Sequence, residues 1–231
     1  NLLMSDIRHI AFIMDGNGRW ARLRNKPRNF GHRKGVETLK TVIDAAEKLG
    51  IEVVSFFAFS TENWKRPKSE RDKLFEMIKK FADDELIKYA KRNIRSNFMG
   101  DTSALPEDVR VSIDKVRDFT KDNTGMVINI AINYGGRAEI VNAVNNIIES
   151  GLSNIDEVQF AHYLDSNGLP DPDIIVRTSG EKRLSNFMLY QAAYSELIFV
   201  DEYWPDFNEQ TLLNVLEEYN RRTRRFGNIK E

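Results

Sequence analysis

Short apolar runs alternate with longer amphipathic segments along this chain, and this alternation limits its fold more than any other feature. Six runs have the length of a buried strand, and they fall at residues 9–14, 51–59, 94–99, 126–133, 173–177 and 197–200. Because strands separated by helices pair in parallel and need cover on both faces, we predict an α/β fold. It should be one domain over residues 1–231, with a mainly parallel β-sheet flanked by helices. Ligands of such sheets bind at the carboxyl ends of the strands.

Local signals between these runs predict where the helices begin and end. Residues 36–49 carry apolar side chains at 3.6-residue spacing, and Gly50 stands where a glycine that ends a helix is expected. Residues 69–72 (SERD) resemble a capping box that opens the next helix. Pro106 suits the first turn of a helix, and Asn208 suits the N-cap of the last one.

The composition fits one soluble domain in a reducing compartment. The chain has 231 residues, 41% of them hydrophobic, which is enough for one ordinary core. It has no cysteine, which excludes disulfides, thiolate metal sites and cysteine nucleophiles. Its net charge of −1 disfavours nucleic acid as a partner. The longest apolar run, around residues 53–59, is too short to cross a bilayer and no signal-peptide pattern is visible, so we expect a cytoplasmic protein.

The stretch HIAFIMDGNGRWAR, at residues 9–22, joins the first apolar run to a carboxylate, two glycines and an arginine. Residues 16–36 then contain seven basic side chains and no Asp or Glu. A solvated basic helix face is the alternative explanation for such a run. Because the basic residues directly follow a glycine turn at the end of a strand, the pattern favours a phosphate ligand.

Two other classes of enzyme share parts of this pattern. The spacing of Gly16, Gly18 and Ala21 fits a dinucleotide fingerprint, but that fingerprint needs a second strand that ends in an acid about twenty residues later. The residues around Glu37 are predicted to be helical instead. A phosphatase with an aspartyl nucleophile would need an Asp two residues after Asp15, where this chain has Asn17.

Two further loops after predicted strands are dense in polar groups. Residues 60–67 (STENWKRP) combine hydroxyl, carboxylate, carboxamide, indole and guanidinium groups. An Asx-type turn with an anchoring tryptophan would explain Asn63 and Trp64 but not Ser60, Glu62 or Arg66. Residues 177–186 (RTSGEKRLSN) carry two arginines and a serine that suit a second diphosphate, with structural ion pairs as the alternative. Together the loops indicate two anionic substrates, or one substrate with two phosphate groups.

Taken as a set, the motifs HIAFIMDGNGRWA, FGHRKG, FAFSTENWKRP, INYGGRAEI, RTSGEKRLSNF, WPDF and RRTRRFGN resemble the bacterial cis-prenyltransferase family, undecaprenyl diphosphate synthases among them. The resemblance runs in order from about His9 to Gly227. It implies an enzyme that condenses isopentenyl diphosphate repeatedly onto farnesyl diphosphate, with Mg²⁺, to make a long polyprenyl diphosphate. The expected product is undecaprenyl diphosphate for the cell-wall lipid carrier. A shorter or medium-length product, or a non-catalytic partner subunit of the same fold, is the alternative.

The resemblance also assigns roles to the polar residues of the three loops. Asp15 and Asn63 would be catalytic, and Asp15 would bind Mg²⁺ together with Glu196. The allylic diphosphate would lie against Gly16, Asn17, Gly18, Arg19, Arg28 and His32, while Trp20 would help to shape the pocket in which the substrates react. The second loop would bind substrate through Ser60, Thr61, Glu62, Trp64 and Arg66. Isopentenyl diphosphate would be held by Arg177, Arg183, Leu184 and Ser185.

Asn63 is the family's usual candidate for removing the proton after condensation. A carboxamide is a very poor base, so we expect Asn63 to orient the substrate while a diphosphate oxygen takes the proton. The family lacks a DDxxD motif, and this chain lacks one too. We interpret its acidic residues 83–85 (DDE) as an exposed helix face.

A growing polyprenyl tail implies an apolar tunnel, for which ordinary core packing is the alternative explanation at each position. The candidate lining residues are Phe56, Phe57, Ala58, Leu74, Met77, Ile78, Phe81, Ile130 and Ile132. The family resemblance further implies a homodimer in which the C-terminal Arg225 and Gly227 reach the partner's site. Product release would involve peripheral contact with a membrane.

Overall fold

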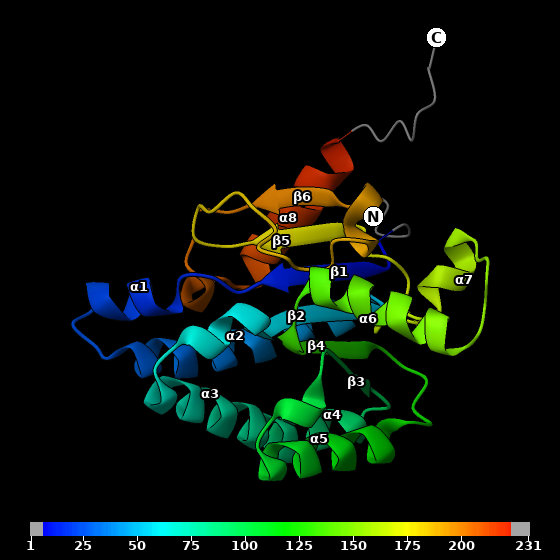
Figure 1. Cartoon of the computed structure of the whole chain (residues 1–231). Helices are drawn as coiled ribbons and strands as arrows, with labels where there is room; N and C mark the ends of the chain where they lie inside the picture. Colours follow the sequence, from blue (N-terminus) through cyan, green and yellow to red (C-terminus); the bar gives the residue numbers. More distant parts are fainter. Residues whose placement is uncertain (1–6, 223–231) are drawn as a thin grey trace.

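The computed structural model describes residues 7–222. Its centre is one sheet of six parallel strands in the order β3-β4-β2-β1-β5-β6 (Figure 1). All six predicted strands are confirmed, with ends that shift by one or two residues. The strands are β1 (His9–Ile13), β2 (Val53–Ser60), β3 (Arg95–Met99), β4 (Val127–Tyr134), β5 (Ile174–Arg177) and β6 (Glu196–Phe199).

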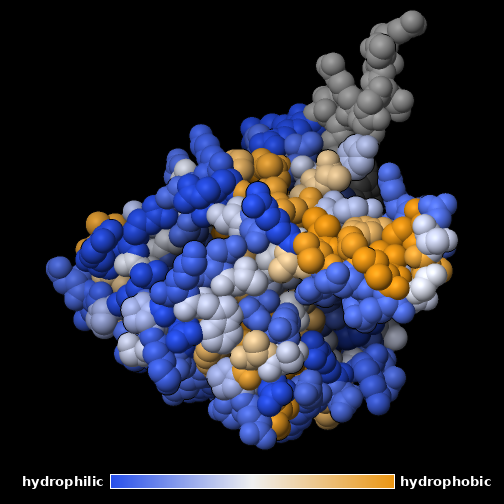
Figure 2. Space-filling model, viewed as in Figure 1, coloured by the Kyte–Doolittle hydropathy of each residue, from blue (hydrophilic) through white to orange (hydrophobic). Residues whose placement is uncertain are grey.

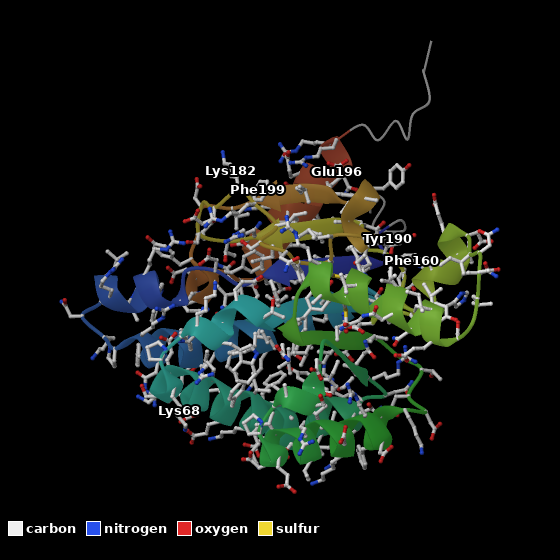
Figure 3. The ribbon with its side chains drawn as sticks, viewed as in Figure 1. Lys68, Phe160, Lys182, Tyr190, Glu196 and Phe199 are labelled. Atoms are coloured by element: carbon white, nitrogen blue, oxygen red, sulfur yellow. The ribbon has the colours of Figure 1, made fainter. Side chains whose placement is uncertain are left out.

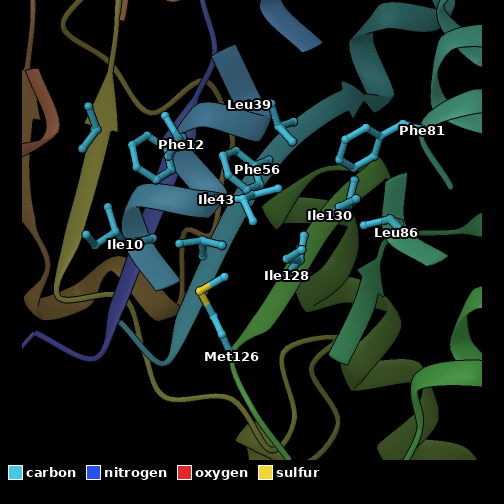
Figure 4. Packing of buried hydrophobic residues seen from close by; sticks show 14 of the residues in the cluster. Ile10, Phe12, Leu39, Ile43, Phe56, Phe81, Leu86, Met126, Ile128 and Ile130 are labelled. Atoms are coloured by element: carbon cyan, nitrogen blue, oxygen red, sulfur yellow. The ribbon is translucent and has the colours of Figure 1, made fainter. Parts of the chain in front are cut away.

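Helices cover both faces of this sheet, with α6 in front of it and α8 behind it in Figure 1. Side chains alternate between the faces along each strand, so Ile10 and Phe12 enter a large core while Ala11 and Ile13 enter a smaller one. Figure 4 shows part of the large core, where Phe12 and Phe56 stack beneath α2. The helices are α1 (Asn17–Leu23), α2 (Arg28–Lys48), α3 (Lys68–Lys80), α4 (Ile87–Ala90), α5 (Glu107–Thr120), α6 (Gly136–Glu149), α7 (Glu157–Ala161) and α8 (Glu209–Arg221).

Helix α2 begins at Arg28, eight residues before the predicted start at residue 36. Two glycines in this first part interrupt the apolar spacing that predicts a helix. A Cβ atom on Gly31 would lie 2.0 Å from the backbone oxygen of Asn17, and one on Gly35 would lie 2.4 Å from the Asn17 Oδ1 atom. The glycines therefore let α1 pack directly on α2. The predicted C-terminal end is confirmed, since Gly50 has a φ of +76° just after the helix.

The capping-box prediction for residues 69–72 is wrong. Helix α3 begins after Pro67, and no side chain caps it. A capping box lies instead between Ser60 and Asn63, at the start of the short 3₁₀ helix Thr61–Lys65. Pro106 directly precedes α5 rather than standing inside its first turn. Asn208 caps α8 as predicted, because its side chain accepts a hydrogen bond from the Thr211 N–H at 3.2 Å.

The acidic residues 83–85 lie in a π-helical turn, Phe81–Leu86, that joins α3 to α4. Asp84 is exposed as expected, whereas Asp83 and Glu85 are half-buried and form ion pairs with Lys79 and Lys40. Within residues 7–222, no helix is long and apolar enough to cross a membrane.

Candidate active site

The loops that follow β1, β2 and β5 hold nearly all of the predicted site residues. These three strands are neighbours in the sheet and run in the same direction, so their loops meet at one edge. Two adjoining hollows lie there: a polar pocket of about 460 Å³ and an apolar cavity of about 170 Å³.

Asp15 lies where the loops after β1 and β5 meet. Its carboxylate pairs with the Arg177 guanidinium at 3.0 Å and with the Arg19 guanidinium at 3.3 Å. The Thr178 hydroxyl fixes the Asp15 backbone from both sides, since it accepts from the N–H at 2.9 Å and donates to the carbonyl at 2.7 Å. The Arg177 side chain is almost fully buried. Asp15 is therefore held firmly beside positive charge from two loops.

The polar pocket carries a strong excess of positive charge. Asp15 is the one acidic side chain among the residues that line it, and five of the lining side chains are cationic: Arg19, Arg22, Lys26, Arg28 and Arg66. No side chain caps the start of α1, so its first backbone N–H groups remain free to bind an anion. The pocket therefore suits a multiply charged anion such as a diphosphate, as the acid-free stretch 16–36 predicts.

His32 lies at the junction of the two hollows and lines both. Its Nδ1–H donates to the Arg28 carbonyl at 3.1 Å, which leaves Nε2 as a hydrogen-bond acceptor. The pKa of His32 is lowered to about 4. Burial is the largest cause, and the positive charges of Arg28 and Arg66 add to it, while the charge of Glu70 opposes them. The imidazole is therefore neutral at neutral pH, and a bound anion would favour its charged form.

Two side chains of the loop after β2, Asn63 and Trp64, make contacts that stabilise the fold. The Asn63 Oδ1 atom accepts from the Ser60 N–H at 3.1 Å, and the Trp64 indole N–H donates to Asn133 Oδ1 at 2.7 Å. Trp64 also contacts the rings of Phe59 and Phe75. The anchoring tryptophan of the alternative explanation is thus present, but Asn63 closes a capping box with Ser60 instead of an Asx-type turn. Asn63 and Arg66 nevertheless line the apolar cavity, so the loop also faces the site.

The loop after β5 brings together the residues that were predicted to bind a second diphosphate. Arg177 Nη1 donates to Ser185 Oγ at 2.6 Å and to the Arg183 carbonyl at 2.7 Å. The Arg183 side chain is exposed and pairs with Glu181 at 2.6 Å, and Glu181 also pairs with Arg19 at 3.0 Å. Leu184 packs against the smaller core instead of presenting its side chain to the site.

Trp20 holds α1 in place rather than lining either hollow. Its indole N–H donates to Asp206 at 2.7 Å, and its ring stacks between Phe30 and the Arg24 guanidinium. The ring therefore contributes to the site only through the position that it gives to α1.

The apolar cavity lies between the sheet, α2 and α3. Seven of the nine residues proposed for a tunnel line it: Phe57, Ala58, Leu74, Met77, Ile78, Phe81 and Ile130. Phe56 and Ile132 are instead fully buried in the large core. The cavity and the polar pocket share Met14, Asn17, His32 and Arg66 among their lining residues. The two hollows therefore adjoin each other and together suit a molecule with an anionic head and an apolar tail.

Comparison with known proteins agrees with this geometry. Residues 13–227 match a prenyltransferase family model described as "Putative undecaprenyl diphosphate synthase". The isoprenyl transferase of Clostridium perfringens is 46% identical over 229 residues, covering 96% of this chain and 90% of the relative. The chain belongs to the undecaprenyl diphosphate synthase family. The isoprenyl transferase of Bacillus subtilis is also 46% identical, covering 96% of this chain and 87% of its own.

Solved structures of family members have the same fold. A lavandulyl diphosphate synthase from Lavandula x intermedia, in complex with dimethylallyl diphosphate, superposes with a TM-score of 0.92 at 35% identity. The superposition covers 96% of this chain and 98% of the synthase. A probable undecaprenyl diphosphate synthase from Campylobacter jejuni gives 0.82 at 36% identity, over 97% and 100% of the chains. The resemblance found in the motifs is confirmed, and family membership makes the chain a cis-prenyl-chain-elongating transferase with isoprenoid diphosphate substrates.

Glu196 does not lie near Asp15 within a single copy of the chain. Asp15 follows the carboxyl end of β1, whereas Glu196 is the first residue of β6 and pairs in register with Ile174, the first residue of β5. Figure 3 places Glu196 and Lys182, which lies in the loop after β5, toward opposite ends of the sheet. Glu196 forms an ion pair with Arg222 at 2.9 Å. Among residues 7–222, no cluster of three or more His, Asp or Glu side chains could hold a metal alone.

Three polar residues at the carboxyl edge of the sheet were not among the predicted site residues. Arg22 and Lys26 line the polar pocket, and their signal was present in the acid-free stretch 16–36. Thr178, the first residue after β5, fixes the backbone of Asp15 although it lies 163 residues away along the chain. No local pattern predicts that contact.

Proposed function

We propose that this chain is an active cis-prenyltransferase that condenses isopentenyl diphosphate repeatedly onto farnesyl diphosphate. The product would be a long polyprenyl diphosphate of undecaprenyl length, which serves as a lipid carrier for the cell wall. The observation that carries the proposal is that a cationic pocket adjoins an apolar cavity and shares lining residues with it. Asp15, Arg177 and Arg183 are all present at the same carboxyl edge of the sheet, which favours an active enzyme over a non-catalytic partner subunit.

The chemistry needs stabilisation of charge on a leaving diphosphate. As the allylic C–O bond breaks, negative charge grows on the diphosphate, and Arg19, Arg28 and Arg66 are positioned to stabilise it. The double bond of isopentenyl diphosphate forms the new C–C bond, and the adduct then loses a proton. Asn63 already accepts a hydrogen bond from Ser60, so its NH₂ group is the part left to orient substrate. The proton goes to a diphosphate oxygen.

Mg²⁺ is the cofactor that the donor set fits. Mg²⁺ is commonly bound by one or two carboxylates together with substrate phosphates, so the single carboxylate of Asp15 in the polar pocket is sufficient. A bound ion would supply positive charge to the two diphosphates. Glu196 lies too far along the sheet to share that ion within one chain.

Growth of a long tail requires more room than the apolar cavity offers. An engineered cavity of roughly 150 Å³ holds one benzene molecule, and this cavity measures about 170 Å³. Val36, Met77 and Phe81 line both the cavity and an outer groove between α2 and α3. Separation of the two helices at these residues would open a tunnel and bring the tail to a membrane surface.

A crosslink between α2 and α3 tests this exit. Cysteines at Val36→Cys and Met77→Cys would be the only ones in the chain, so a short bis-maleimide would react there alone. We expect the crosslinked protein to make only short products, while the unreacted double variant makes long ones. Equal product lengths would contradict the exit between these helices.

A homodimer in the cytoplasm is the assembly that we propose. Val141, Val144 and Ile148 form an exposed apolar stripe on α6, with 57%, 42% and 67% of each residue accessible, and Figure 2 shows apolar surface over this helix. A second copy of the chain would cover this stripe. The C-terminal residues Arg225 and Gly227, expected to reach the partner's site, lie outside the described residues. Sedimentation of the wild type and of Ile148→Asp would test the interface, with a monomeric variant expected.

The decisive experiment is product analysis with labelled substrate. Purified protein is incubated with farnesyl diphosphate, labelled isopentenyl diphosphate and Mg²⁺, and the extracted lipids are sized by chromatography. A ladder that ends near eleven isoprene units would support the proposal, since undecaprenyl names that length. Termination at fewer units would favour the shorter-chain alternative, and no incorporation would favour a non-catalytic subunit.

A further inference from the structure

The motif INYGGRAEI has no role in the chemistry described above, but its two glycines lie against the loop after β5. That loop has an unusual backbone, because three non-glycine residues within four positions have positive φ angles: +49° at Ser185, +67° at Asn186 and +44° at Met188. Such conformations are costly and persist only where surrounding contacts fix them.

Asn186 makes most of those contacts. Its backbone carbonyl accepts from the Gly136 N–H at 2.7 Å, and its Oδ1 atom accepts from the Arg137 N–H at 2.9 Å. These two donors open α6 and have no partner within the helix. Asn186 therefore satisfies the start of α6 and is itself held in its left-handed conformation.

The paired glycines leave space for this arrangement. A Cβ atom on Gly135 would lie 2.7 Å from the Asn186 Nδ2 atom and 2.8 Å from the Thr61 Oγ1 atom. One on Gly136 would lie 2.8 Å from the Leu189 Cγ atom. A side chain at either position would therefore have to displace Asn186 and Thr61, or Leu189.

Asn186 also joins this loop to the loop after β2. Its Nδ2 group donates to Glu62 Oε1 at 3.2 Å, and hydrogen bonds from Asn186 and neighbouring groups lower the pKa of Glu62 despite its partial burial. On one side of Asn186 in the chain, Ser185 accepts from Arg177. On the other side, Phe187 stacks on Phe57, which lines the apolar cavity, with ring centres 4.6 Å apart.

We propose that Asn186 is a positioning residue that sets the distance between the two substrate sites by locking the loop after β5 onto Gly135 and Gly136 and onto Glu62. The inference rests on the proposed condensation of isopentenyl diphosphate with an allylic diphosphate. Asn186 lies outside the polar pocket and reaches the second diphosphate group through Ser185 and Arg177, so its loss should weaken binding of that group more than binding of the first one.

An exchange of hydrogen-bond polarity tests the proposal. Asn186→Asp keeps the shape and the acceptor for Arg137 but sets a carboxylate against Glu62. We expect the dissociation constant for isopentenyl diphosphate to rise and kcat to fall, each about tenfold, which is the effect of losing roughly one charged hydrogen bond. The dissociation constant for farnesyl diphosphate should stay within twofold. When Asn186→Asp is combined with Glu62→Gln, position 62 supplies the donor and position 186 the acceptor, so the hydrogen bond between them can form again. Binding of isopentenyl diphosphate and kcat in this double variant should therefore return close to the values of Glu62→Gln alone.

Asn93→Asp is the matched control. Asn93 also has a positive φ, +63°, and its amide likewise accepts a backbone N–H and donates to a side chain, both at Thr124. It precedes β3, at the opposite edge of the sheet, so its variant should bind and turn over both substrates normally.

Binding is measured by calorimetry, separately from turnover. If the wild type binds both diphosphates without condensing them, the proposed function is contradicted. The binding constants of the Asn186 variants would still test the positioning role. The inference itself is overturned if Asn186→Asp weakens the binding of both substrates equally. It is also overturned if the losses of the two single variants simply add in the double variant. Thermal melts of all variants should agree within a few degrees, and a large drop limited to Asn186→Asp would also contradict a positioning role.

Discussion

Asp15 is the residue at which the segments after β1 and β5 meet, because Arg19 of α1 and Arg177 at the end of β5 both reach its carboxylate. We expect Asp15→Ala and Asp15→Asn to lose turnover with Mg²⁺, since both remove the one carboxylate of the polar pocket. Asp15→Asn keeps an acceptor for the buried Arg177, so its melting temperature should stay close to that of the wild type. Product formation at the wild-type rate by either variant would refute the catalytic assignment.

Arg183 differs from Arg177 in that its guanidinium is exposed and pairs only with Glu181 among the described carboxylates. Arg183→Ala should raise the KM for isopentenyl diphosphate by roughly 10- to 100-fold, the effect of a lost hydrogen bond between charged groups. The KM for farnesyl diphosphate should change little. Arg183→Lys should rescue only in part, because lysine keeps the charge and loses the two-pronged geometry. Steady-state kinetics with each substrate varied in turn would measure this, and equal effects on both would argue against separate pockets.

Which residues of the site could be predicted from the sequence depends on whether their role is local. Asp15 and Arg19 come shortly after β1 and Arg177 ends β5, so position alone predicts their place at one edge. Thr178 and Asn186 act through contacts with residues far along the chain, and no spacing reveals them. Glu196 was assigned from the family alone, although the predicted strand begins just after it, which puts it at the other edge of the sheet.

Among the elements, the strands were predictable because each is a short apolar run with a polar boundary. The start of α2 was not, since Gly31 and Gly35 serve a close contact with α1 and hide the helical pattern. The bulge in β2 was not predictable either. Phe57 pairs with Ala131 and Phe59 with Ile132, so Ala58 is an extra residue in the strand. Bulges redirect side chains next to active sites, and this one brings Ala58 to the cavity wall.

The first strand is tied to its neighbours by a buried histidine. His9 Nδ1–H donates to the Pro170 carbonyl at 2.7 Å, and Nε2 accepts from the Ser55 hydroxyl at 2.7 Å. Burial lowers the pKa of His9 to about 4, although the Pro170 carbonyl and the charge of Asp173 oppose this effect.

Stability should therefore fall in acid. Between pH about 6.5 and about 4 the unfolded chain binds a proton at this residue and the folded chain does not, which costs up to about 1.4 kcal/mol per pH unit. Urea unfolding of the wild type at pH 7, 6 and 5 should show this dependence of the unfolding free energy on pH. His9→Asn should reduce its slope by up to the contribution of one bound proton, about 1.4 kcal/mol per pH unit. The contribution of His32 remains in both proteins. Identical slopes, or an NMR titration of His9 near pH 6.5, would contradict the assignment.

At the scale of the whole molecule, the sheet separates two tasks. Its carboxyl edge holds charge in the polar pocket, while the space between the sheet, α2 and α3 holds the apolar cavity. Because the two hollows share His32 and Arg66, a substrate bound by its head must place its tail toward α3. Rate and product length should then depend on different residues.

Ala58→Leu tests that separation. Ala58 lines the cavity and not the polar pocket, so a larger side chain there should stop elongation early while the first condensation continues. Ala58→Ser, of similar size, is the control and should leave product length unchanged. If Ala58 only packed a closed core, leucine would instead cost about 1–3 kcal/mol of stability without altering the products. Product sizing and thermal melts on the same sample distinguish the outcomes, and a lowered melting temperature with products of full length would show that the tail does not pass Ala58.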